Sequence, residues 1–112
     1  MANVLSVSRY KNVKLDLTTT SATTLYTAPT AKTAIFKSLV AADDSGSTST
    51  ITVTITDAST AVFVLYNAKA TAANGTLELL DKPLVVQEGE IVKVTAANAN
   101  RLHVIGSYIE IS

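Results

Sequence analysis

Apolar and polar side chains alternate along several short stretches of this chain. In Thr50–Thr56 the order is T-I-T-V-T-I-T, so Ile51, Val53 and Ile55 fall at every second position. A period of two places these three side chains on one face of a β-strand and the threonines on the other. Residues 13–17 show a similar alternation, and β-branched residues, which favour strands, occur throughout the chain. The pattern predicts mainly β-structure.

Other stretches are apolar at consecutive positions. Val62–Tyr66 reads V-F-V-L-Y, and Ile35–Val40 carries apolar residues on both of its predicted faces. Strands of this kind need cover on both sides. In a chain of 112 residues one face can meet the core, and we expect the other to meet a second layer or another subunit.

Turn-forming residues separate these stretches. They occur at Asp43–Ser47, at Asn74-Gly75, at Gln87–Glu90 and at Asn98–Asn100. A spacing of about 8 to 12 residues between turns predicts an all-β fold, a single antiparallel β-sandwich, jelly-roll-like, with about eight or nine short strands. The strands are expected near residues 12–17, 23–27, 33–41, 49–56, 61–67, 76–80, 83–86, 90–96 and 101–111.

The length predicts one domain, which we place at residues 12–112 behind an N-terminal arm at residues 1–11. The arm contains Arg9 and Tyr10, and either it docks on a neighbouring molecule or it is a frayed terminus. Ala68–Ala73 is rich in alanine but too short for an isolated helix, so we expect a loop there.

The chain carries few charges and no cysteine. Its formal net charge is +0, and charged residues make up 16% of it, so there is no field to attract nucleic acid or an anionic membrane. The first ten residues lack the features of a signal peptide, and no apolar run approaches the ~20 residues that cross a bilayer. We expect neither nucleic acid nor membrane as a partner, and synthesis in the cytoplasm.

The residues that could carry chemistry are scarce. His103 stands between Leu102 and Val104 in a predicted strand with no nucleophile motif elsewhere in the chain, which favours a structural or interface histidine. Asp43-Asp44 lacks the spacing of a calcium loop, and Glu88 and Glu90 flank a turn glycine without aromatic residues to hold a sugar. We therefore expect no enzyme activity, and no catalytic, cofactor or metal site.

Several segments together resemble small structural proteins of tailed bacteriophages, including those of marine phages. The likeness lies in S-A-T-T-L-Y-T-A-P at residues 21–29, K-T-A-I-F-K-S-L-V at residues 32–40, T-L-E-L-L-D-K-P-L-V-V at residues 76–86 and E-G-E-I-V-K-V-T-A-A-N-A-N-R-L-H-V-I-G-S-Y-I-E-I-S at residues 88–112. The resemblance covers roughly residues 12–112. It implies a β-sandwich virion protein, made in the host cytoplasm, with no catalytic residues.

The resemblance and the spare apolar surface together predict a capsid decoration or cement protein that forms a homo-oligomer, with a trimer favoured, and binds virion proteins such as the major capsid protein. The alternatives are a tail, neck or fibre-associated protein, or a receptor- or glycan-binding module. The expected interface residues are Arg9, Tyr10, Phe63, Leu65, Tyr66, Leu102, Val104 and Tyr108.

Overall fold

A computed structural model describes residues 7–112, in which all regular structure is β-strand. The all-β prediction is confirmed. No helix in this part of the chain is long and apolar enough to cross a bilayer. The strands are β1 (Ser8–Leu17), β2 (Thr23–Thr27), β3 (Thr33–Asp43), β4 (Ser49–Thr56), β5 (Val62–Thr71), β6 (Thr76–Glu78), β7 (Leu84–Val86), β8 (Ile91–Ala96) and β9 (Leu102–Ile111).

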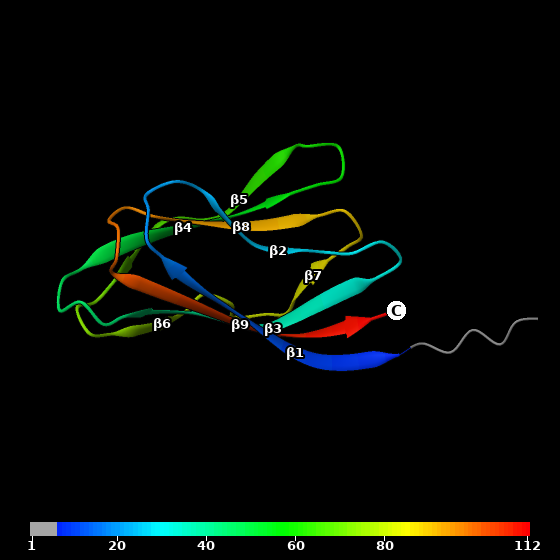
Figure 1. The fold of residues 1–112 in the computed structure, drawn as a ribbon, viewed down its shortest axis with the longest axis horizontal. Coiled ribbons are helices and arrows are strands. Elements are labelled where there is room, and N and C mark those ends of the chain that lie inside the picture. Colours follow the sequence, from blue (N-terminus) through cyan, green and yellow to red (C-terminus); the bar gives the residue numbers. More distant parts are fainter. Residues whose placement is uncertain (1–6) are drawn as a thin grey trace, which may run out of the picture.

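The strands form two antiparallel sheets that face each other (Figure 1). Sheet A has the order β1-β9-β3-β6, with β7 also paired to β3, and sheet B has the order β2-β8-β4-β5. The chain crosses from one sheet to the other at nearly every connection, and only β4 and β5 form a hairpin within one sheet. This order is that of a jelly roll, with β6 and β7 together occupying one strand position.

The core lies between the inner faces of the two sheets. Its side chains come from the alternating apolar positions, including Ile51 and Val53, which are fully buried as the T-I-T-V-T-I-T pattern predicts. Near one end of the sandwich three aromatic rings meet: Phe36 stacks on Tyr108 at 4.9 Å between ring centres, and Tyr26 meets the edge of Phe36 at 5.4 Å. Such ring pairs add about 0.5–1.5 kcal/mol each beyond the area they bury.

Gly106 allows this aromatic cluster to lie close to β9. A Cβ atom at position 106 would stand 2.8 Å from Cε2 of Phe36 and 3.2 Å from Cγ1 of Val13. Phe36 is buried and held between Tyr108 and Tyr26, so its ring has no free direction in which to move. A residue without a side chain is therefore required here by packing.

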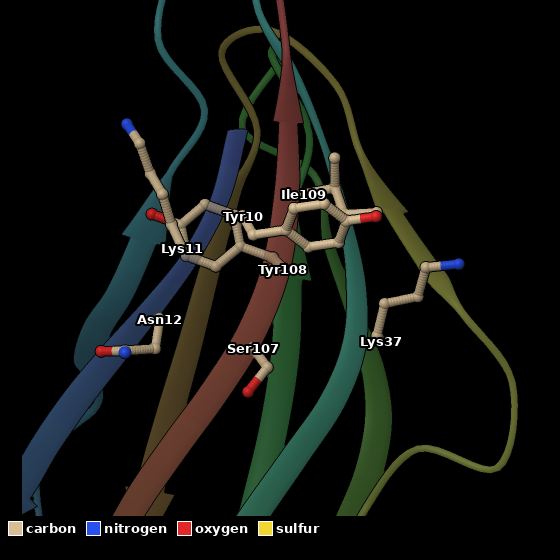
Figure 2. A pocket seen from close by; sticks show the side chains of 7 residues that line it. All are labelled: Tyr10, Lys11, Asn12, Lys37, Ser107, Tyr108 and Ile109. Atoms are coloured by element: carbon tan, nitrogen blue, oxygen red, sulfur yellow. The ribbon is translucent and has the colours of Figure 1, made fainter. Parts of the chain in front are cut away.

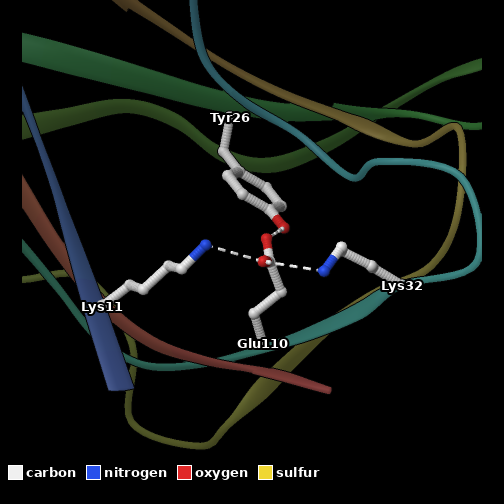
Figure 3. A network of polar contacts seen from close by, with 4 residues as sticks. All are labelled: Lys11, Tyr26, Lys32 and Glu110. Atoms are coloured by element: carbon white, nitrogen blue, oxygen red, sulfur yellow. Dashed lines mark hydrogen bonds and ion pairs between the residues drawn. The ribbon is translucent and has the colours of Figure 1, made fainter. Parts of the chain in front are cut away.

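Glu110 connects the two sheets at the same end (Figure 3). This carboxylate on β9 is buried, accepts a hydrogen bond of 2.8 Å from the Tyr26 hydroxyl on β2, and pairs with Lys11 Nζ at 2.8 Å and Lys32 Nζ at 3.8 Å. The hydrogen bonds from Lys11 and Tyr26 hold the pKa of Glu110 below its ordinary value, against the opposing effect of burial. Burial and the bond to Glu110 raise the pKa of Tyr26.

Two predicted boundaries differ from the structure. Of the expected arm, residues 1–6 lie outside the described residues, and residues 8–11 are the start of β1, paired with β9 from Ser8 onward. The expected loop at 68–73 is strand as far as Thr71. In β5, Ala68 takes a left-handed φ of 51°. Its N–H donates a hydrogen bond to Thr52 Oγ1, and the strand bulges at this point and then resumes.

Candidate interaction surfaces

Four exposed apolar residues follow one another on β5. Val62 is 61% exposed, Phe63 55% and Val64 60%, and Leu65 also lies on the surface. Of the ten residues of β5 only Thr71 is buried. We call Val62–Leu65 the β5 surface. One face of this run was expected to meet the core, but all four side chains are exposed.

β5 is the last strand of sheet B (Figure 1). Val62 to Val64 pair regularly with Thr56 to Thr54 of β4, after which two register shifts carry β5 past Tyr66. Tyr66 is half-buried against the core, and Lys69 Nζ lies 5.8 Å from the centre of its ring. The other side of β5 has no strand partner among residues 7–112.

Three of the expected interface residues lie inside the molecule. Leu102 and Val104 are fully buried, and Tyr108 belongs to the aromatic cluster. Even-numbered side chains of β9 face the core and odd-numbered ones face outward. The outward apolar residues of this strand are therefore Ile105, Ile109 and Ile111, and the buried three are not part of the surfaces considered below.

The outer face of sheet A carries an apolar row. Tyr10 on β1 is paired with Ile109 on β9, Ile109 with Ile35 on β3, and Ile35 with Val85 on β7, so the four side chains cross the sheet side by side. Tyr10 is 85% exposed and Val85 is exposed as well. We call these four residues the outer row. Arg9, the neighbour of Tyr10, is also exposed.

A shallow groove runs beside the outer row (Figure 2). The Tyr10 ring lies next to Ile109, and Asn12 and Ser107, which are paired across β1 and β9, follow along the same face. Lys37 borders the groove from β3. An exposed aromatic ring beside an amide, a hydroxyl and an ammonium group can stack on a sugar ring and hydrogen-bond its hydroxyls.

His103 lies on the outer face of sheet A between two acidic residues. Its Nε2 is 3.4 Å from Oδ1 of Asp16, and its Nδ1 is 3.7 Å from Oδ2 of Asp44. All three side chains are exposed, and within residues 7–112 the contacts of the His103 ring are to these two carboxylates. The imidazole thus lies at the surface between two carboxylates.

The other acidic candidates already have polar partners within the described residues. Asp43 is buried and its Oδ1 accepts bonds from the N–H and hydroxyl of Ser45, while Asp44 points to His103 instead. Glu88 accepts a hydrogen bond from the N–H of Ala31, and Glu90 accepts one from the N–H of Gln87. Within the described residues no three histidine, aspartate or glutamate side chains converge as metal ligands would.

Comparison with known proteins leaves the chain without an assigned family. None of the protein-family models matches the sequence, and no curated protein matches it.

Proposed function

We propose that this chain is a non-enzymatic structural protein of a tailed-bacteriophage particle, which self-associates and docks on the capsid surface as a decoration or cement protein. The observation that carries the proposal is the outer row, an apolar line across four strands on a sheet face that residues 7–112 leave uncovered. A flat apolar line with a polar surround is typical of a surface that meets another protein.

The topology supports this proposal. Many viral capsid proteins are jelly rolls, but lectins and enzymes have this fold as well. The fold is therefore compatible with a virion protein, and the proposed role rests on the exposed apolar surfaces. The two surfaces are separate: the β5 surface is at the edge of sheet B, and the outer row is on the face of sheet A. One can hold copies together while the other contacts the major capsid protein.

The location is tested by counting copies in purified particles of the phage that encodes the chain, using quantitative mass spectrometry. We expect hundreds of copies, as on a capsid. A few to a few dozen copies would instead favour the tail, neck or fibre alternative, and a particle without the chain would refute both.

The docking surface is tested with particles that lack the protein, to which purified variants are added. Val85→Lys places a charge in the outer row, and we expect it to weaken binding at least tenfold because an unpaired charge would be buried in the contact. Lys82→Ala is the control, since Lys82 is exposed nearby but outside the row. Equal binding of Val85→Lys and the wild type would exclude the outer row.

A receptor- or glycan-binding module is the second candidate, and the groove beside Tyr10 favours it. If the groove binds sugar, Tyr10→Ala removes the stacking ring, and glycan-array signals should fall at least tenfold while Val85→Lys leaves them unchanged. An array without reproducible signals for the wild type would exclude this candidate.

A further inference from the structure

We propose that Asn74 is a site of spontaneous deamidation, in which the main-chain nitrogen of Gly75 attacks the side-chain amide of Asn74. Asn74 is followed by glycine, whereas the other asparagines of the chain are followed by valine, alanine or arginine. Glycine has no side chain to hinder the approach of its nitrogen, so Asn74 is the asparagine that can close this ring most readily. The inference is independent of the proposed virion role, and each can fail without the other.

The fold requires both residue types at this point. Asn74 has a left-handed φ of 54°, which asparagine adopts more readily than most residues. A Cβ atom at position 75 would stand 3.0 Å from Cβ of Ala72 and 3.1 Å from its carbonyl oxygen, so glycine is required there by space. The reactive pair is therefore a direct consequence of the backbone geometry of the turn.

The pair is accessible to water. It lies in the connection between β5 and β6, where the chain passes from sheet B to sheet A. Asn74 is exposed, and Gly75 is half-buried. The amide is thus open to the solvent that the second step of the reaction consumes.

The reaction needs water and no other reagent. The nitrogen of Gly75 bonds to Cγ of Asn74, the Cγ–Nδ2 bond breaks, and Nδ2 leaves as ammonia with the hydrogen that the Gly75 nitrogen gives up. Water then opens the cyclic imide. Cleavage between the imide nitrogen and Cγ gives aspartate, and cleavage between this nitrogen and the main-chain carbonyl carbon of residue 74 gives isoaspartate. No group is oxidised or reduced.

The hydrogen bonds of the turn slow the first step in the folded chain. The N–H of Gly75 donates to the carbonyl oxygen of Ala72 at 3.0 Å, and the carbonyl oxygen of Gly75 accepts from the N–H of Asp43 at 2.9 Å. The imide nitrogen carries no hydrogen, so the bond to Ala72 is lost when the ring closes. The turn must therefore open locally before the reaction, and unfolding removes this requirement.

The products alter the corner at which the two sheets are connected. Nδ2 of Asn74 lies 3.9 Å from the place of a Cβ atom on Gly46, which stands in the turn that contains Asp43 and Asp44. A carboxylate at position 74 adds a like charge to this corner. Isoaspartate also lengthens the main chain by one carbon, which displaces the Gly75 carbonyl from the N–H of Asp43. We expect both products to be less stable than the parent chain.

The site is tested by incubating the folded chain in mildly alkaline buffer and mapping its peptides by mass spectrometry. Cleavage after lysine and arginine places Asn74, Asn67 and Asn98 in different peptides, and deamidation replaces an NH by an oxygen, which changes the mass. Asn67 and Asn98 are exposed and precede alanine, so they are matched internal controls. We expect Asn74 to convert about tenfold faster than either, because alanine hinders ring closure. Conversion of Asn74 at the rate of the controls would overturn the assignment.

The opening step is tested with urea and with Ala73→Pro. Wild type should deamidate about tenfold faster in urea than when folded, because the turn is then open. Ala73 is the second residue of the turn, where proline is favoured. The folded variant should react roughly two- to fivefold more slowly than the wild type, and the two should react equally in urea. Equal rates of the wild type in both states, or equal slowing of the variant in both, would overturn the role of the turn.

Asn74→Asp reproduces the aspartate product and tests its effect. We expect its thermal midpoint to lie roughly 2–4 °C below that of the wild type, with a smaller difference at high salt, which screens the added charge. Asn67→Asp adds the same charge two residues before Lys69 and should leave the midpoint almost unchanged. A midpoint of Asn74→Asp equal to that of the wild type would overturn the expected destabilisation.

Discussion

Replacing Gly106 by alanine should destabilise the fold by about 1–3 kcal/mol, the usual penalty for adding a methyl group to a filled core. The added Cβ would lie 2.8 Å from the Phe36 ring, which is stacked on Tyr108 and cannot turn away. Thermal unfolding should show a midpoint lowered by about 4–8 °C for each kcal/mol. Ser107→Ala, one residue along but on the outer face, should change it little.

The cause can be isolated with a second substitution. If the clash with Phe36 is responsible, Phe36→Leu should be less damaging in the Gly106→Ala background than in the wild type, with a coupling energy of about 1 kcal/mol. Strictly additive effects of the two substitutions would show that Gly106 matters for another reason.

Replacing Glu110 by glutamine should destabilise the fold by about 2 kcal/mol at pH 7, since hydrogen bonds to a charged group contribute about 1.5–3 kcal/mol each. The variant keeps the size of the side chain but loses the charge that attracts Lys11 and strengthens the bond from Tyr26. Lys11 and Lys32 are partly exposed and can turn to water, which limits the effect. Urea unfolding measures it, with Asp81→Asn as an exposed control.

The same variant should change the pH dependence of stability. The pKa of Glu110 is lower in the folded chain than in the unfolded one, so its contribution is present above the unfolded value of about 4.3 and is lost as pH falls toward the folded pKa. The free energies of unfolding of wild type and Glu110→Gln should therefore converge as the pH is lowered below about 4. A difference that stayed constant down to pH 2 would mean that the charge of Glu110 contributes nothing.

The strand pattern was predictable where one face is apolar and the other polar. In β4 the alternation of Ile51 and Val53 with threonines gives both the strand and its buried face. The start of β1 was not predictable, because Ser8 to Lys11 are exposed in the structure and show no apolar face. The end of β5 could not be predicted from the sequence for a similar reason, because Ala68 to Ala70 are exposed and surround a bulge.

The outer row was missed because β9 is apolar on both faces. Leu102 and Val104 could be interface residues as readily as Ile105 and Ile109, and the period of two does not say which set faces inward. Glu110 made the choice harder, since a charged residue on the even-numbered face argues for exposure. Only the pairing of Glu110 with Tyr26 and Lys11 shows why a carboxylate can be buried there.

The position of β9 also shapes how the molecule must be made. This strand lies between β1 and β3 in sheet A, yet it is the last of the nine to leave the ribosome. Before β9 is made, β1 has no strand partner in sheet A. The sheet is then incomplete, and its apolar inner face is exposed to water. Sheet A can therefore be completed only after β9 has been made, and folding is expected to be slow for the size of the domain because most contacts join residues far apart along the chain.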